Sequence, residues 1–122
     1  MATFRYTKSH EYIREDNGTY YLGITDHAQG QLGDITFVEL PATGAKFSAG
    51  QACCTVESVK AVAEVYAPID LEVTGGNARL EDSPELINKD AAGEGWLITL
   101  APSDPGSLDS LMDQAAYDAL EK

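Results

Sequence analysis

The sequence predicts a mainly β fold, a small sandwich or barrel of short strands with short helices at its periphery. Its apolar runs are short and are interrupted by glycine, proline, asparagine or aspartate, which is typical of strands joined by turns. Asn17 and Gly18 stand between two such runs, and this dipeptide is a strong hairpin signal. A length of 122 residues suits one domain that buries a core without disulfides or a metal.

The first third of the chain is predicted to hold four strands and one short helix. Thr25 and Asp26 resemble a helix N-cap, because their side-chain oxygens can accept hydrogen bonds from the first free backbone N–H groups. Pro41 closes the fourth strand, and a loop with glycines follows it. The strands are expected at residues 4–7, 11–15, 19–24 and 35–40, and the helix at residues 27–32.

The middle of the chain predicts a tight hairpin. Two apolar strands, residues 52–57 and 61–67, are separated only by Ser58, Val59 and Lys60. So short a connection forms a turn and nothing more, which places Lys60 at its tip.

The later core elements are shorter. A second turn is expected at residues 68–71, a strand at residues 72–74 and a break in the sheet at residues 75–77. Ser83 resembles an N-cap with Pro84 at the first helical position, so a short helix should follow. That helix is expected to continue to Asn88, and the last core strand is expected at residues 96–100.

The C-terminal segment has a different pattern, with apolar residues at helical spacing in an acidic background. This spacing predicts one helix or two short ones over residues 107–121, packed on the domain by an apolar stripe. A frayed acidic tail is the alternative, given the terminal position. The stripe consists of Leu108, Leu111, Met112, Ala115, Ala116 and Leu120.

The charge balance excludes several classes of partner. The chain has 20 acidic and 8 basic side chains, a formal charge of −12. This disfavours nucleic acid and anionic membranes, which bind through lysine and arginine, and it suits a partner with a basic docking surface. No signal peptide or membrane-length apolar run is visible, so the cytoplasm is the default location. A mature mitochondrial protein without its transit peptide would look the same.

The two cysteines, Cys53 and Cys54, are adjacent. Neighbours on a strand point to opposite faces, so a disulfide between them would be strained and a shared metal site awkward. We expect two small, half-buried hydrophobic side chains in a reducing compartment.

No catalytic constellation is visible, so we expect a protein that is not an enzyme and has no metal site. His10 and His27 lack zinc-type spacing, the G-x-S-x-G motif is absent, and the Gly93–Gly95 segment lacks the third glycine of a phosphate loop. Lys60 stands out, because a lysine on a rigid hairpin tip is accessible to a modifying enzyme. An ordinary solvated turn lysine fits the same spacing.

Residues 57–61, Glu-Ser-Val-Lys-Ala, resemble the lipoylation motif of the glycine cleavage system H proteins, and the likeness extends over nearly the whole chain. The segment Ser-His-Glu-Tyr at residues 9–12 is similar to a family motif in which Tyr12 replaces the usual tryptophan. Further family-like motifs follow in order at residues 23–29, 32–34, 38–41, 84–88 and 95–97.

The resemblance implies a barrel-sandwich hybrid of the lipoyl/biotinyl-carrier type, with short peripheral helices and a C-terminal helix. It implies one lipoyl-carrier domain over residues 1–122, with residues 103–122 as a C-terminal helical extension. Lys60 would carry lipoate through an amide bond, as N6-lipoyllysine. Glu57 would take part in recognition by the lipoylating enzyme, and Glu11 would lie near the cleft for the loaded arm, although a solvated strand acid fits Glu11 as well.

The resemblance also implies the partners. Lipoate would shuttle an aminomethyl group from a pyridoxal-phosphate (PLP)-dependent glycine decarboxylase to a tetrahydrofolate-dependent aminomethyltransferase, and dihydrolipoamide dehydrogenase would reoxidise it. A lipoate ligase or lipoyltransferase would attach it. Val59 and Ala61 beside the lysine argue against biotin, whose carriers usually have methionine on both sides. A protein that visits several enzymes is expected to be a monomer.

The sequence departs from the family's usual residues at two places. Leu71 stands where the family usually has glycine, and a positive φ there would cost about 1–2 kcal/mol unless the turn differs and Gly75 and Gly76 absorb the change. Ala91 and Ala92 replace a usual Pro-Tyr pair.

The alternative functions are a lipoyl relay protein that donates lipoate to other 2-oxoacid dehydrogenase complexes, and a small enzyme of unknown type.

Overall fold

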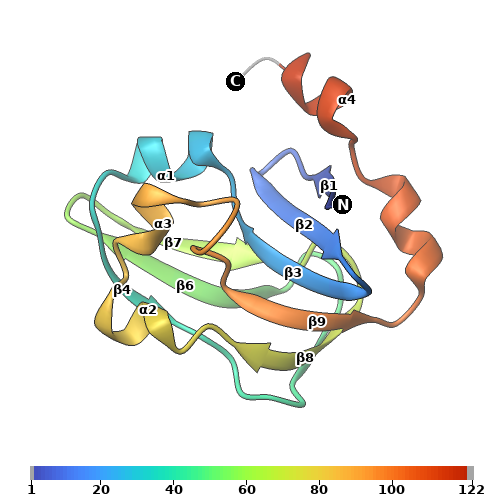
Figure 1. Cartoon of the computed structure of the whole chain (residues 1–122), viewed down its shortest axis with the longest axis horizontal. Coiled ribbons are helices and arrows are strands. Elements are labelled where there is room, and N and C mark those ends of the chain that lie inside the picture. Colours follow the sequence, from blue (N-terminus) through green and yellow to red (C-terminus); the bar gives the residue numbers. More distant parts are fainter. Residues whose placement is uncertain (1, 121–122) are drawn as a thin grey trace.

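The computed structural model describes residues 2–120 and contains two antiparallel sheets (Figure 1). Neither sheet closes on itself within these residues, and the mainly β fold with short helices confirms the predicted class. In spatial order, the larger sheet holds β1 (Thr3–Tyr6), β2 (Glu11–Asp16), β3 (Thr19–Ile24), β9 (Ile98–Pro102), β8 (Leu71–Gly76) and β5 (Lys46–Phe47). The smaller sheet holds β4 (Ile35–Glu39), β6 (Ala52–Ser58) and β7 (Val62–Tyr66).

The predicted hairpin between β2 and β3 is confirmed. Asp16 pairs with Thr19, and the two turn residues Asn17 and Gly18 both have positive φ, at 53° and 82°. These are the left-handed conformations that a two-residue hairpin turn requires, which is why asparagine and glycine occupy it. The turn therefore fixes the register of the first two long strands.

The core lies between the two sheets. Alternate side chains of β4, β6 and β7 point inward, and they pack with side chains from β3, β8 and β9 in one buried cluster. The cluster's β-sheet members include Val38, Val56, Val65, Leu22, Val73, Ile98 and Leu100. Because the inner face of the small sheet is filled in this way, the opposite face of that sheet is left to solvent.

Helices α1 (Asp26–Leu32), α2 (Arg79–Asp82) and α3 (Leu86–Lys89) lie at one side of the sheets, where Figure 1 places α1 beside α3. Thr25 caps α1 by accepting from the Ala28 N–H, as the sequence predicts. The predicted Ser83 cap is wrong, because Ser83 ends the unforeseen helix α2, and α3 follows Glu85 instead.

The predicted sheet break at residues 75–77 is also wrong in part. Gly75 and Gly76 belong to β8 and pair with β9 across a register shift that follows Val73. Leu71 begins the same strand, is buried, and does not have positive φ. The leucine at the usual glycine position is therefore an ordinary strand residue, and the glycines tolerate the irregular pairing downstream.

The C-terminal segment forms two short helices, one of the two forms the spacing predicts. They are the 3₁₀ helix η1 (Pro105–Ser110) and α4 (Gln114–Asp118); residue 121 of the predicted range lies outside the described residues. Of the predicted stripe, Ala115 and Ala116 are exposed, and Tyr117 is the buried residue of α4. Tyr117 stacks on Tyr6 at 4.5 Å between ring centroids, which fixes α4 against β1.

Tyr12, which replaces the family's usual tryptophan, is fully buried. Its hydroxyl donates to the Ala91 carbonyl at 2.6 Å, and burial raises its pKa well above the ordinary value for tyrosine. A Cβ at Gly23, on the paired strand, would lie 2.5 Å from the Tyr12 oxygen, so glycine makes room for the ring. Tyr12 and Ala91, two residues that differ from the family's usual ones, are therefore in direct contact.

The expectation that Cys53 and Cys54 point to opposite faces is wrong. Both thiols are buried and free, and their sulfur atoms lie 3.8 Å apart. A register shift in β6 between Ala52 and Cys54 interrupts the strict alternation of side chains, which turns both thiols to the interior. Contact with Cys53, together with burial, raises the pKa of Cys54, as suits an inert core residue.

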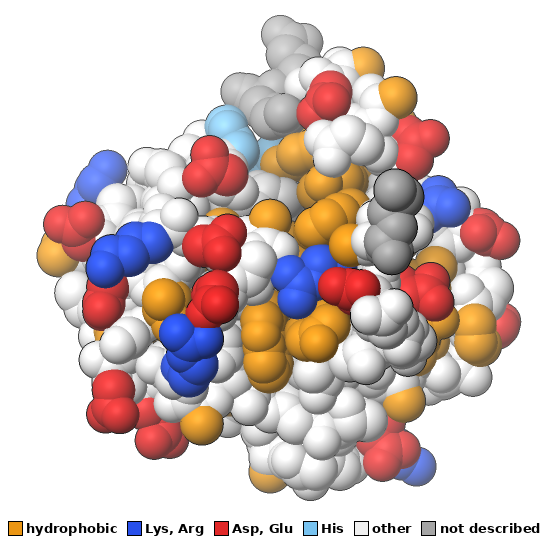
Figure 2. Space-filling model, viewed as in Figure 1, with side chains coloured by type: hydrophobic (Ala, Val, Ile, Leu, Met, Phe, Trp, Pro, Cys, Tyr) orange, Lys and Arg blue, Asp and Glu red, His pale blue; other side chains and the backbone are white. Residues whose placement is uncertain are grey.

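Acidic side chains are spread over the face drawn in Figure 2, with fewer basic ones between them. This distribution fits the formal charge of −12. Within the described part of the chain, no helix has the length and apolar character needed to cross a membrane.

A pair of glycine variants tests the packing of α3. A Cβ at Gly95 would lie 2.8 Å from the Cα of Ile87 and 2.8 Å from the Leu86 carbonyl oxygen, both backbone atoms. We expect Gly95→Ala to lower the free energy of unfolding by about 2 kcal/mol, measured by urea denaturation. Gly30→Ala is the control, because α1 has open space there, and it should stabilise by up to about 1 kcal/mol. Equal stability of the two variants would contradict this packing.

Candidate functional site

Lys60 lies at the tip of the β6–β7 hairpin, exposed to solvent, where the sequence places it. Ser58 closes the turn: its N–H donates to the Ala61 carbonyl at 2.8 Å, and its hydroxyl oxygen accepts from the N–H groups of Lys60 and Ala61. Neither of the two ion pairs among residues 2–120 involves Lys60. The amine is therefore held on an ordered turn and faces solvent.

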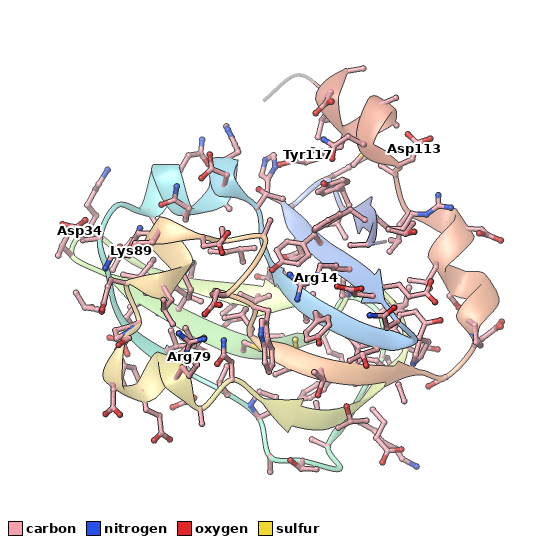
Figure 3. All side chains as sticks on the ribbon, in the orientation of Figure 1. Arg14, Asp34, Arg79, Lys89, Asp113 and Tyr117 are labelled. Carbon is pink, nitrogen blue, oxygen red and sulfur yellow. The ribbon has the colours of Figure 1, made fainter. Side chains whose placement is uncertain are left out.

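The loop between α1 and β4 supports this turn from one side. The Val59 N–H donates to the Asp34 carbonyl at 3.0 Å. Gly33 has a φ of 79°, and a Cβ on it would come within 3.0 Å of Lys60 Cε, so the alkyl chain of Lys60 rests over the glycine. Figure 3 labels Asp34 at the same end of the molecule as this hairpin.

Asn88 of α3 holds that loop in place. Its side-chain oxygen accepts from the Ile35 N–H at 2.8 Å, and its side-chain nitrogen donates to the Gly33 carbonyl at 2.9 Å and to Gln29 Oε1 at 2.8 Å. One side chain thus joins α1, the loop and the start of β4. Sequence reasoning missed this role, although a polar residue that ends a short apolar helix is a signal for it.

Glu57 lies on the outer face of the small sheet, at the last pair before the turn. It pairs with Phe37 of β4 on one side and Val62 of β7 on the other. Its neighbour Val56 is buried in the core, so the carboxylate of Glu57 points the opposite way. The sheet therefore presents Glu57 and Lys60 at the same end of β6.

Glu11 is not a solvated strand acid: only 3% of it is exposed. One carboxylate oxygen accepts from the hydroxyls of Thr7 and Ser9 at 2.5 and 2.6 Å, and the other accepts from the Tyr66 N–H at 3.2 Å. Glu11 belongs to the large sheet and Tyr66 to the small one, so this carboxylate bridges the two sheets. These three hydrogen bonds satisfy the carboxylate oxygens, which burial removes from water.

Glu11 lines a groove of about 200 Å³ between α1, β2 and β7. The polar end of the groove contains Ser9, His10 and Glu11, and its apolar part contains Leu32 and Val56. Leu32 directly precedes the glycine that supports Lys60. The groove is further lined by Ile24, Ala28, Gln31, Ala63, Glu64 and Val65.

His10 connects the rim of the groove to the C-terminal helix. It has a left-handed φ of 70°, and its Nδ1 lies 2.8 Å from the hydroxyl oxygen of Tyr117. The Tyr117 hydroxyl, whose residue is labelled in Figure 3, donates in turn to the Thr25 side-chain oxygen at 2.9 Å. Burial raises the pKa of the Tyr117 hydroxyl, so this group stays protonated at neutral pH. The apolar stripe predicted from the sequence did not include Tyr117, because the residues that contact it, such as His10 and Thr25, are distant in sequence.

The site combines an exposed lysine on an ordered turn with a groove and a buried carboxylate. Lys60 offers an accessible amine, and Leu32, which directly precedes the glycine under the Lys60 side chain, lines the groove that also contains the buried carboxylate of Glu11. No cluster of three or more potential metal ligands occurs within residues 2–120. Cys53 and Cys54 lie below a different hollow and do not line this groove.

Comparison with known proteins gives a consistent result. Residues 4–122 match the family model described as Glycine cleavage H-protein. A glycine cleavage system H protein of Shewanella sediminis is 50% identical over 120 residues, covering 98% of this chain and 93% of that protein. One from Shewanella oneidensis is 52% identical over 117 residues, covering 95% of this chain and 91% of its own.

A solved structure agrees with the fold. The crystal structure of a glycine cleavage system H protein from Mycobacterium marinum superposes with a TM-score of 0.84 at 35% sequence identity. The match covers 94% of this chain and 93% of that one. The two-sheet architecture is therefore shared over nearly the full length of both chains.

Removal of the Asn88 side chain tests the support of the hairpin. We expect Asn88→Ala to lower the free energy of unfolding by about 1–3 kcal/mol, because it leaves buried donors and acceptors without partners. Hydrogen exchange at the Val59 N–H should accelerate more than exchange at core amides. Lys89→Ala, an exposed neighbour on α3, is the control and should change neither quantity. Unchanged Val59 exchange in Asn88→Ala would show that α3 does not support the turn.

Proposed function

The chain belongs to the glycine cleavage H-protein family, and from this premise we propose that it is the lipoyl carrier of a glycine cleavage system, with lipoate attached to Lys60 through an amide bond. The observation that carries the proposal is the exposed Lys60 on an ordered hairpin turn, resting over Gly33, next to which Leu32 lines a groove that also contains the buried carboxylate of Glu11. A carrier of this kind leaves catalysis to its partners, so we propose that the chain itself is not an enzyme.

The residues around Lys60 fit a long acyl group on its amine. Gly33 leaves space beside the lysine chain, and the groove beyond it offers an apolar lining followed by a polar end. When bound, lipoate supplies a disulfide that can accept an aminomethyl group at a decarboxylase and release it at a transferase. Attachment to a fixed turn replaces diffusion of a free intermediate by a high local concentration at each partner.

Glu11 would bind the amine of the cargo. Its two oxygens accept three hydrogen bonds, which fix their position, and a carboxylate has capacity to accept more at the groove that Glu11 lines. The carboxylate would neutralise an ammonium group, while the apolar lining near Leu32 and Val56 would keep water away from a hydrolysable bond. This division of the groove protects the cargo between enzymes.

We propose three enzymes as partners: a PLP-dependent glycine decarboxylase, a tetrahydrofolate-dependent aminomethyltransferase and dihydrolipoamide dehydrogenase. A lipoate ligase or lipoyltransferase would load Lys60, with Glu57 in its recognition site. The bacterial origin of the similar proteins supports a cytoplasmic location. The net charge of −12 suits transient docking to basic surfaces on several enzymes.

Replacement of the lysine tests the assigned attachment site. In a reconstituted system with the three enzymes, the lipoylated wild-type protein should support glycine decarboxylation, and Lys60→Arg should reduce it to background. Lys46→Arg is the matched control, since Lys46 is also exposed but lies on β5, and it should retain full activity. A lipoylated wild-type protein that fails here but donates its lipoyl group to acyltransferase subunits would instead be a relay protein.

Replacement of the groove carboxylate tests the role of Glu11. Glu11→Gln keeps an oxygen acceptor and a similar shape but removes the charge, so the fold should persist. We expect the aminomethyl-loaded protein to lose its cargo about tenfold faster, the loss expected for one charge-assisted hydrogen bond. Glu15→Gln, on the same strand but exposed, is the control. A Glu11→Gln protein whose loaded form is as long-lived as wild type would contradict the assignment.

A further inference from the structure

We propose that the outer face of the three-stranded sheet, next to the hairpin, is the docking surface for the enzyme that attaches lipoate to Lys60. Its centre is the row formed by Phe37, Glu57 and Val62, called the docking row below. The inference rests on the proposed function, and it adds the surface and the two apolar residues through which the lipoylating enzyme recognises this protein.

The exposed large hydrophobic side chains are the first observation. Among residues 2–120 there are four, and all of them lie on the small sheet or its hairpin. Phe37 is 51% exposed on β4, Val62 is 64% exposed and Tyr66 is 40% exposed on β7, and Val59 is 67% exposed in the turn. Apolar surface gathered on one sheet in this way marks an interaction site rather than a random surface.

The strand register is the second observation. Phe37 is directly opposite Glu57, and Glu57 is directly opposite Val62, so the three side chains stand in line across β4, β6 and β7. This row is the last one before the turn that carries Lys60. Two apolar side chains therefore flank the carboxylate that sequence resemblance associates with lipoylation.

The charge of the surface is the third observation. The next row away from the turn places Thr55 between Glu39 and Glu64, which are both exposed. Within the three strands and the turn, Lys60 is the only basic residue. The face is thus apolar beside the turn and acidic around it, which complements an enzyme surface with a hydrophobic contact and a basic rim.

The chemistry of attachment selects this occupant over the other partners. The Lys60 amine attacks the carbonyl carbon of a lipoyl group activated at its carboxyl by the enzyme; an amide bond forms, the activating group leaves, and the amine gives up its protons to solvent. Before lipoylation, only the lysine side chain separates the amine from the turn. The attaching enzyme must therefore contact the turn and the strands beside it. Enzymes that use the far end of the attached arm can act at a greater distance from the sheet.

Only one side of the hairpin is open to such an enzyme. The inner side chains Val56 and Val65 are in the core, and the α1–β4 loop contacts the turn through Gly33 and Asp34. The outer face carries no helix or loop over the docking row, consistent with the exposure of Phe37 and Val62. An approaching protein meets this face and the lysine together.

Kinetics of lipoylation test the docking row. The unlipoylated protein is titrated into a purified lipoate ligase with lipoate and ATP, and Phe37→Thr and Val62→Thr are compared with wild type. We expect KM for the carrier to rise about tenfold for Phe37→Thr and about threefold for Val62→Thr, with kcat nearly unchanged, because these contacts bind the carrier without touching the reacting atoms. Ala101→Thr, at an exposed position of β9 in the other sheet, is the control and should behave as wild type.

A second measurement separates docking from other effects. Once lipoylated at high enzyme concentration, Phe37→Thr and Val62→Thr should support glycine decarboxylation at the wild-type rate. The inference is overturned if their KM values stay at the wild-type value, if Ala101→Thr raises KM as much, or if only the decarboxylase step suffers. Failure of the wild-type protein to accept lipoate would overturn the proposed function itself, which the wild-type control distinguishes.

Discussion

The chain reverses direction between β6 and β7 in a turn that Ser58 closes with hydrogen bonds to Lys60 and Ala61, and the proposed attachment site depends on this turn. Both flanking strands are anchored by inward side chains in the core, so the turn projects from a rigid base. The α1–β4 loop, which Asn88 holds in place, supports the turn from one side. The amine of a flexible lysine is thereby presented from a well-defined position.

A hydrogen bond between the two sheets fixes the position of Glu11, the buried acid of the proposed site. Glu11 joins them through its bond to the Tyr66 N–H, and the same carboxylate lies at the polar end of the groove. Burial of an acid is unfavourable unless donors surround it, and Thr7 and Ser9 supply two of them. Glu11 thus combines a sheet-to-sheet connection with a carboxylate that lines the groove.

Local signals in the sequence predicted the hairpins and most strands, because the turn residues and alternation that specify them are themselves local. The elements it predicted wrongly depend on distant contacts: the pairing of Gly75 and Gly76 with β9, and the bulge that turns Cys53 inward. The site shows the same division. Lys60 and Glu57 stand in one recognisable motif, whereas Asn88 acts through segments remote in sequence, and only the folded chain brings them together.

The attachment of lipoate to Lys60 is the central claim, and mass spectrometry of the intact protein and its peptides tests it most directly. The chain is produced in a lipoate-replete host that contains a competent ligase. The account predicts a mass increase of one lipoyl group, located by fragmentation on Lys60. An unmodified protein, or a lipoyl group found on another lysine such as Lys46 or Lys89, would contradict it.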